Sequence, residues 1–282
     1  MAECGVCFRH CDIPEGRLGF CGGRITRYGR VEAFNYGRIT SIALDPIEKK
    51  PLARFFPGSM ILSVGSFGCN LRCPFCQNHD ISWSEHAKRF ADTAETISPG
   101  QLADIALAAR QRGNIGIAFT YNEPLIGYEF VRDTAMIAKS TGLKTVMVTN
   151  GTAELAVFEE IRPYIDAMNI DLKGFTDRYY SKVLGGDRKQ VMAFIESAVK
   201  TCHVELTTLV VPGENDSEDE MRELSQWVSG LKDPDGDDIP LHVTRFFPRF
   251  HMRDRGATDV RTVYRLADIA RENLKHMYTG NC

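Results

Sequence analysis

Short apolar stretches alternate with segments of helical periodicity through the middle of the chain, and this alternation limits the possible folds. Between the stretches, apolar residues recur every three or four positions, as on the buried face of a helix. Strict alternation of strands and helices indicates a parallel sheet covered by helices. The pattern leaves open a full or partial barrel and a doubly wound sheet. Six strands are expected, at 60–64, 115–120, 144–149, 167–171, 203–211 and 241–247.

The segments on either side of this alternating region have a different character. Residues 1–58 are rich in cysteine and glycine and hold only short strand candidates, at 24–28, 31–34 and 39–44. They read as a small cysteine-rich metal-binding module. Residues 59–250 form the expected core, and residues 251–282 a C-terminal helix, at about 260–277, with a short tail.

Composition places the chain among ordinary globular proteins. It has 282 residues, 43% of them hydrophobic and 25% charged, and a net charge of -3. That charge gives no general attraction to nucleic acid, although a local basic patch would be compatible with it. No apolar run reaches the roughly 20 residues of a membrane span, and the N-terminus lacks the basic start of a signal peptide. We therefore expect a cytoplasmic protein with reduced thiols and no membrane partner.

The nine cysteines fall into two tight groups and two isolated residues. Tight groups of thiols in a reducing compartment indicate metal binding more than disulfides. Cys202 reads as a small core residue, and Cys282 as an exposed terminal thiol. The first group is Cys4, Cys7, Cys11 and Cys21, and the second is Cys69, Cys73 and Cys76.

The second group follows the first core strand with the spacing C-x3-C-x2-C. A [4Fe-4S] cluster usually has four cysteine ligands, so three leave one iron open. An open iron can chelate an amine and a carboxylate, and the cluster can supply an electron that cleaves a bound sulfonium. The alternative is zinc, with a distant fourth ligand such as His79 or Cys202.

The first group has the spacing C-x2-C-x3-C-x9-C. Four thiolates saturate either a tetrahedral zinc ion or a closed [4Fe-4S] cluster, and the spacing does not distinguish them. A disulfide pair is a third option. The low apolar content of this segment indicates that it needs a bound metal to fold.

With Phe75 between its second and third cysteines, the loop resembles the signature of the radical S-adenosylmethionine (SAM) superfamily. This resemblance implies a partial (β/α)6 barrel of the TIM type. It also implies reductive cleavage of SAM to methionine and a 5′-deoxyadenosyl radical, which abstracts hydrogen from a substrate. Phe75 would then lie near the SAM adenine.

Other motifs resemble those of the same superfamily. Glu123-Pro124 is similar to the end of its Gly-Gly-Glu-Pro motif, with Tyr121-Asn122 in place of the glycines. The resemblance implies that Glu123 and Asn122 bind the SAM amino group. Glu123 could instead cap the following helix.

Two further motifs resemble pyruvate formate-lyase activating enzymes. Thr149-Asn150 and Asp171-Leu172-Lys173 match these enzymes, while Val148 stands where they have an aspartate. The resemblance implies SAM contacts from Thr149, Asn150, Asp171 and Lys173, the last two also acting catalytically on the substrate. Asp171 and Lys173 share one strand face and could equally form a structural ion pair.

Motifs at 45–52, 56–59 and 245–248 are similar to the AMMECR–Memo-associated radical SAM enzymes. The resemblances together imply an oxidoreductase with flavodoxin or ferredoxin as electron donor. They suggest a protein substrate, as in glycyl-radical activation. Modification of a nucleic acid or a metabolite, and a metal-binding adaptor without turnover, are the competing interpretations.

Overall fold

A curved sheet of eight strands forms the centre of the molecule in the computed structural model, which describes residues 1–282 except the side chains of Lys88, Ala91 and Asp92. The strand order is β14-β13-β12-β11-β10-β9-β7-β6, and all neighbours are parallel except β6 and β7. The strands are β6 (Ser41–Pro46), β7 (Met60–Gly65), β9 (Asn114–Phe119), β10 (Lys144–Thr149), β11 (Ala167–Asp171), β12 (His203–Val210), β13 (Leu241–Arg245) and β14 (Met277–Gly280).

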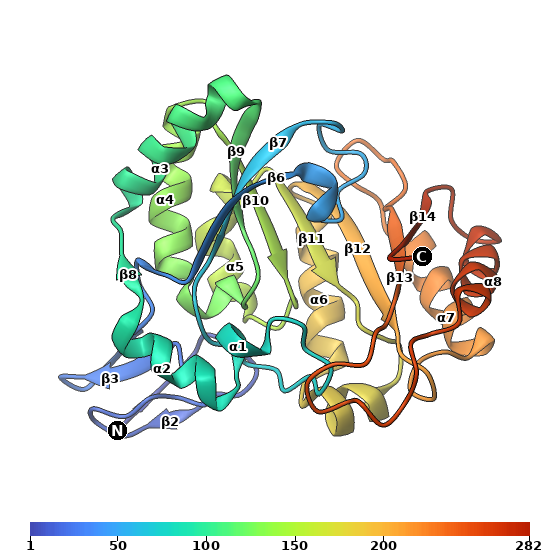
Figure 1. The fold of residues 1–282 in the computed structure, drawn as a ribbon, viewed down its shortest axis with the longest axis horizontal. Helices are drawn as coiled ribbons and strands as arrows, with labels where there is room; N and C mark the ends of the chain where they lie inside the picture. The colour runs from blue at the N-terminus through green and yellow to red at the C-terminus, as the bar shows by residue number, and fades with distance from the viewer.

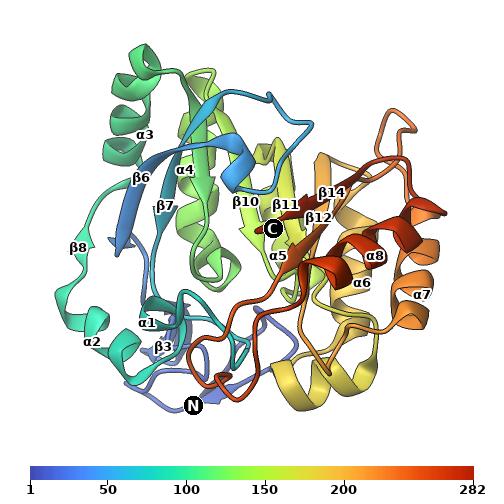
Figure 2. The same cartoon turned by 45° about the vertical axis from the view of Figure 1, so that its right-hand side comes forward.

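Helices cover the outer face of this sheet, as Figures 1 and 2 show. Each connects two parallel strands and buries one apolar side; α8, for example, buries Val263, Leu266 and Ala270 against β13 and β14. The resulting partial (β/α) barrel confirms the fold predicted from the alternating pattern. The helices are α3 (Pro99–Ala108), α4 (Tyr128–Ser140), α5 (Leu155–Ile161), α6 (Arg188–Ala198), α7 (Glu218–Ser229) and α8 (Val260–Arg271).

The N-terminal segment lies beside the carboxyl ends of the parallel strands, at the bottom of Figure 1. Its strands form small pairs, β1 (Ala2–Glu3) with β2 (Asp12–Ile13) and β3 (Arg24–Arg27) with β4 (Arg30–Ala33). The strand predicted at 39–44 is divided. Its first part, β5 (Arg38–Ile39), pairs with β8 (Glu95–Thr96), and its second part is β6 of the main sheet. The proposed module 1–58 therefore shares one strand with the core.

The C-terminal segment differs from the prediction. The helix expected to reach residue 277 ends at Arg271, and β14 follows it in parallel with β13. The strand was missed because it has four residues, all half-buried, without apolar alternation. Pairing with β13 stabilises it as an edge strand.

Shorter helices lie in the connections of the sheet. None of the helices in the described part of the chain is both long and apolar enough to cross a membrane. The short helices are α1 (His79–Ser82), α2 (Glu85–Thr93), the 3-10 turns Ile47–Lys49, Ala109–Arg112, Pro124–Gly127 and Arg162–Tyr164, and the π-helical turn Tyr179–Leu184.

The loop before β7 closes the amino ends of the strands. Glu205, fully buried in β12, accepts hydrogen bonds from the backbone N–H groups of Ala53 (2.9 Å) and Arg54 (2.8 Å). Asn169 of β11 donates to the carbonyl oxygen of Pro51 at 2.8 Å. Because this end is closed, the opposite end is left for a functional site.

Candidate functional site at the carboxyl ends of the strands

The residues predicted to carry the chemistry meet at one end of the sheet. The loop with Cys69, Cys73 and Cys76 follows β7, and Glu123 follows β9. Thr149 ends β10, and Asp171 ends β11. Parallel strands place these positions at a common edge, where ligand sites of α/β folds gather.

The three-cysteine loop is held by backbone hydrogen bonds. Cys73 is 8% exposed, and Cys69 and Cys76 are partly buried. The Leu71 N–H donates to the Cys69 sulfur at 3.4 Å, and the Ser82 side chain and the Asn78 backbone contact the Cys76 sulfur. Burial raises the pKa of the Cys73 thiol to about 12, so ionisation there requires a compensating cation such as bound iron.

The donor set of this loop fits an iron–sulfur cluster. Thiolates at Cys73 and Cys76 would each raise the pKa of the Cys69 thiol, so the three thiols lie within electrostatic range of one another. Each thiolate of a [4Fe-4S] cluster binds its own iron, and N–H donors to the sulfurs are typical of such sites.

A lysine lies beside the cysteine loop. The Lys173 Nζ donates to Asp171 Oδ2 at 2.7 Å, and both groups interact electrostatically with the Cys73 thiol. Although burial alone would lower it, the Asp171 carboxylate raises the pKa of Lys173 well above its usual value. The predicted pair thus supplies a fixed cation and a carboxylate next to the loop.

Glu123 is buried and surrounded by hydrogen-bond donors. Its carboxylate accepts from the Thr149 hydroxyl (2.7 Å) and from the backbone N–H groups of Asn150 (2.8 Å) and Leu125 (3.0 Å). The bond from Leu125 caps the turn Pro124–Gly127, as the alternative interpretation expects. Burial raises the pKa of Glu123 to about 7, and these donors offset only part of that effect.

Asn122 is tied to the base of the cysteine loop. Its amide accepts from Ser66 N–H at 3.0 Å and donates to the carbonyl oxygens of Phe67 (3.3 Å) and Gly68 (3.2 Å). The neighbouring Tyr121 has φ +74°, a conformation that favours glycine and explains the glycine of the similar motif. The direct Asn122–SAM contact stays a prediction, since these bonds give its amide a positioning role.

Asn150 joins the third strand to the cysteine loop. Its Nδ2 atom donates to Asn70 Oδ1 at 2.9 Å and lies 3.7 Å from the Cys69 sulfur. Asn70 is 1% exposed and also donates to the Thr152 hydroxyl at 2.7 Å. Sequence reasoning missed Asn70, although its place between two cysteines of the motif was the available signal.

Phe75 packs inside the site. Its ring meets the ring of Phe246, which directly follows β13, edge to face with centroids 6.2 Å apart. Phe75 is 7% exposed, and Phe246 is 1% exposed. The two rings provide an apolar wall near the loop, consistent with the predicted position beside an adenine.

The four N-terminal cysteines gather around a separate small pocket. Cys4 and Cys7 are buried, and the Gly23 N–H donates to the Cys21 sulfur at 3.4 Å. All nine cysteines of the chain are unbridged, so the structure gives no support to a disulfide here.

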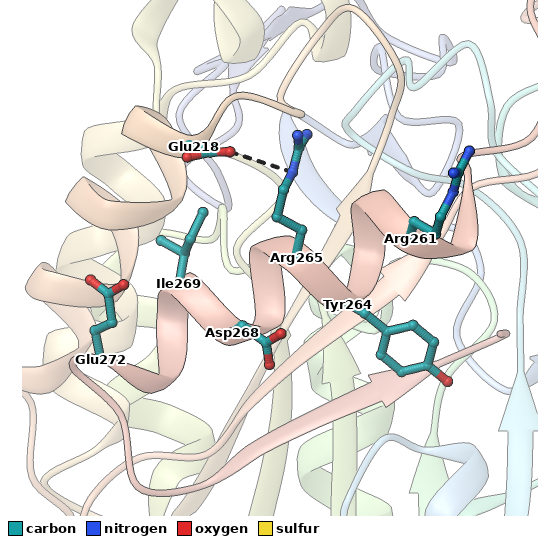
Figure 3. Close-up of a pocket in the computed structure, with 7 residues that line it drawn as sticks. All are labelled: Glu218, Arg261, Tyr264, Arg265, Asp268, Ile269 and Glu272. Carbon is teal, nitrogen blue, oxygen red and sulfur yellow. Dashed lines mark ion pairs between the residues drawn. The ribbon is translucent and has the colours of Figure 1, made fainter.

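A larger hollow lies on the outer surface, between α7 and α8. It is an open groove of about 440 Å³ where Glu218 forms an ion pair with Arg265, as Figure 3 shows. Its other lining residues are Arg261, Tyr264, Asp268, Ile269 and Glu272, and none of the predicted site residues lines it. The groove is separate from the candidate site.

Comparison with known proteins agrees with this geometry. A model of the radical SAM superfamily matches residues 63–225. The protein MJ0808 of Methanocaldococcus jannaschii, whose function is uncharacterized, is 38% identical over 285 residues, covering 99% of this chain and 81% of that protein. The pyruvate formate-lyase 1-activating enzyme of Escherichia coli is 26% identical over 170 residues, covering 58% of this chain and 66% of that enzyme.

Solved structures agree on the fold. Streptococcus suis SuiB bound to S-adenosylmethionine superposes with a TM-score of 0.58 at 14% identity, covering 76% of this chain and 48% of that one. Enzymes of the matched family use a [4Fe-4S] cluster and SAM, in agreement with the loop after β7. The family model and the relative from Methanocaldococcus jannaschii together show that this chain belongs to the radical SAM superfamily.

Proposed function

We propose that the protein is a radical SAM oxidoreductase whose cluster is bound by Cys69, Cys73 and Cys76. The observation that carries this proposal is the convergence of that loop with Glu123, Asn150 and Lys173 at one end of the sheet. The bound cluster would supply one electron for cleavage of SAM to methionine and a 5′-deoxyadenosyl radical, which abstracts hydrogen from a substrate.

The surrounding residues have distinct roles in this proposal. The Glu123 carboxylate receives the SAM ammonium group, and Thr149 and Asn150 hold that carboxylate in place. Asp171 and Lys173 pair opposite charges beside Cys73 and position the carboxylate of SAM or the substrate. The ring of Phe75 excludes water near the adenine.

The activating enzymes among the relatives support a protein substrate. The matched Escherichia coli protein is by name an activating enzyme of pyruvate formate-lyase, which supports a related reaction, abstraction of hydrogen from a polypeptide. Val148, where the activating enzymes have an aspartate, counts against glycyl-radical activation in the form that those enzymes carry out. The electron donor in this proposal is a flavodoxin or a ferredoxin.

The test is anaerobic formation of 5′-deoxyadenosine. Reconstituted wild-type protein, reduced in the presence of SAM, should release methionine and 5′-deoxyadenosine in equal amounts. The variant C69A/C73A/C76A should release neither, and the variant C202S, which changes a buried thiol outside both groups, should retain the activity. A fully loaded wild-type protein that forms no product would contradict the proposal and favour a non-catalytic adaptor.

Deuterium transfer would then identify the substrate. Candidate proteins from the native host, labelled with deuterium at glycine Cα, should pass deuterium to 5′-deoxyadenosine if a glycyl radical is formed. Labelled RNA and metabolite pools provide the matched comparison. Transfer from either of those pools, and none from protein, would overturn the protein-substrate proposal.

A further inference from the structure

The four N-terminal cysteines line one small pocket. Ile13 and Ile126 close its wall together with the thiols of Cys4, Cys7, Cys11 and Cys21. The cavity has a volume of about 10 Å³, enough to admit one sphere of the size of a water molecule. A protected space lined by four thiols is suited to a metal centre.

The position of these thiols distinguishes between two kinds of metal centre. Four thiolates saturate either a tetrahedral zinc ion or a [4Fe-4S] cluster, so the donor set fits both. The thiols lie directly beside the loop of Cys69, Cys73 and Cys76, because a backbone hydrogen bond joins Cys69 to Cys21. A redox-active centre has an electron acceptor at that position and zinc has no such role, so the position favours an iron–sulfur cluster.

We propose that Cys4, Cys7, Cys11 and Cys21 hold a second [4Fe-4S] cluster that passes single electrons to the cluster site at Cys69, Cys73 and Cys76. With four thiolate ligands every iron is saturated, so this cluster carries electrons and does not bind SAM. In each transfer the second cluster is oxidised from 1+ to 2+ and the cluster at Cys69 is reduced from 2+ to 1+. A donor of the flavodoxin or ferredoxin class returns one electron. The relay rests on the proposed function, whereas the metal assignment does not.

The two cysteine groups are in direct backbone contact. The Cys69 N–H donates to the carbonyl oxygen of Cys21 at 3.1 Å. Gly68 permits this contact, because a Cβ at its position would lie 2.6 Å from the same oxygen. Both residues in the contact are themselves proposed ligands, so the path between the two clusters is short.

A second path runs through side chains. The Asn70 amide hydrogen-bonds the Cys7 thiol and accepts from Asn150 Nδ2 at 2.9 Å. Asn150 Nδ2 in turn lies 3.7 Å from the Cys69 sulfur. This hydrogen-bonded chain links one thiol of each group through buried amides.

Two arginines provide positive charge between the groups. Arg9 Nε donates to the Asn70 carbonyl oxygen at 2.7 Å, and Arg72 Nη1 donates to the Cys69 carbonyl oxygen at 2.8 Å. Each guanidinium interacts electrostatically with thiols of both groups. Because a cluster gains negative charge on reduction, these cations favour its reduced state, a function that redox-inactive zinc would not need.

The metal assignment is tested in a full-length variant that lacks the cysteines of the other cluster site. The variant C69A/C73A/C76A, reconstituted anaerobically with iron and sulfide, should retain about four irons per chain, against about eight in the wild type. After reduction it should show the electron paramagnetic resonance signal of a [4Fe-4S]1+ cluster. One zinc per chain, or a folded variant without metal, would overturn the assignment, and the C202S variant controls for general thiol loss.

The relay is tested with two reductants. The variant C4S/C7S/C11S/C21S should keep about four irons. It should form 5′-deoxyadenosine with dithionite but much more slowly with reduced flavodoxin. Equal rates with flavodoxin in this variant and the wild type would refute the relay.

Where the variant does not fold, freeze-quench spectra of the wild type test the relay, because flavodoxin should reduce the second cluster before the cluster at Cys69. A wild-type protein that is inactive with both reductants would refute the proposed function. The metal assignment, which rests on the iron count, would still stand.

Discussion

The backbone N–H of Cys69 donates a hydrogen bond to the carbonyl oxygen of Cys21, with an N···O distance of 3.1 Å. This bond fastens the loop after β7 to the N-terminal segment. Gly68 precedes it with φ +94°, and a side chain there would also meet Ile126 Cδ1 at 2.8 Å. The contact between the two cysteine groups thus depends on a residue without a side chain.

Replacing Gly68 by alanine should separate the two groups. The left-handed backbone costs alanine about 1–2 kcal/mol, and the clash with the Cys21 carbonyl oxygen adds to that cost. We expect a lower melting temperature and incomplete iron loading in G68A. The matched control is G58A, because Gly58 has φ +80° but a Cβ added there would meet no atom within 4 Å. Equal loss of stability and iron in both variants would show that the contact is unimportant.

Lys173 should raise the reduction potential of the cluster at Cys73. Its ammonium group opposes the negative charge gained on reduction, whereas Asp171 acts in the opposite direction. We expect K173Q to lower the potential and D171N to raise it, each by on the order of tens of millivolts. Redox titration followed by electron paramagnetic resonance measures both. Shifts of the same sign in the two variants would be incompatible with this electrostatic role.

SAM binding should depend on the protonation of Glu123. Burial raises the pKa of this carboxyl group to about 7, so part of the ligand-free protein carries it protonated at neutral pH. Because the SAM ammonium group prefers a carboxylate, binding near pH 6 should release a proton, and affinity should rise as pH increases through about 7. Calorimetry in buffers of different ionisation enthalpy measures this release.

Variants at Glu123 and Thr149 provide the control. E123Q should bind SAM at least about tenfold more weakly and lose the pH dependence, because a neutral amide replaces the carboxylate. T149V removes one donor but leaves the carboxylate, so it should retain the pH dependence with a higher pKa. Proton release unchanged in E123Q would assign it to another group.

Much of this fold could be predicted because the parallel strands are buried and strongly apolar. Strands such as β10 and β11 lie at the predicted residues because both of their faces are covered. Edge strands carry a weaker signal: β14 was missed, and β5 and β6 were read as one strand. Their pairing partners are distant in sequence, so local periodicity could not reveal them.

The site residues also divide into those that the sequence could predict and those that it could not. The cysteines and Glu123 stand out because their spacing and residue type imply chemistry. Asn70 and Arg9 do not, since their importance comes from contacts with segments far away in the sequence. Glu205 is another example: it is a carboxylate inside a strand read only as apolar, and its partners come from four other positions.

Glu205 forms a buried network at the amino ends of the strands. His203 Nε2 lies 2.9 Å from Oε1 and His242 Nε2 lies 2.6 Å from Oε2, so each imidazole donates its hydrogen to the carboxylate. Two backbone N–H groups, from Ala53 and Arg54, complete the set of donors. Although burial opposes ionisation, these donors lower the pKa of Glu205 to about 2.

This network should make the fold sensitive to acid. A carboxyl group whose pKa is lower in the folded than in the unfolded state stabilises the fold above its ordinary pKa. That contribution is lost as pH falls from about 4.5 towards 2. The shift corresponds to about 3 kcal/mol of folding free energy at neutral pH.

E205Q should therefore lower the free energy of unfolding by about this amount at pH 7 and flatten its decline below pH 4.5. The exposed E223Q should do neither, and urea titrations between pH 3 and 7 compare the variants. If the free energy of unfolding of E205Q still falls steeply at acid pH, carboxylates other than Glu205 cause the acid sensitivity.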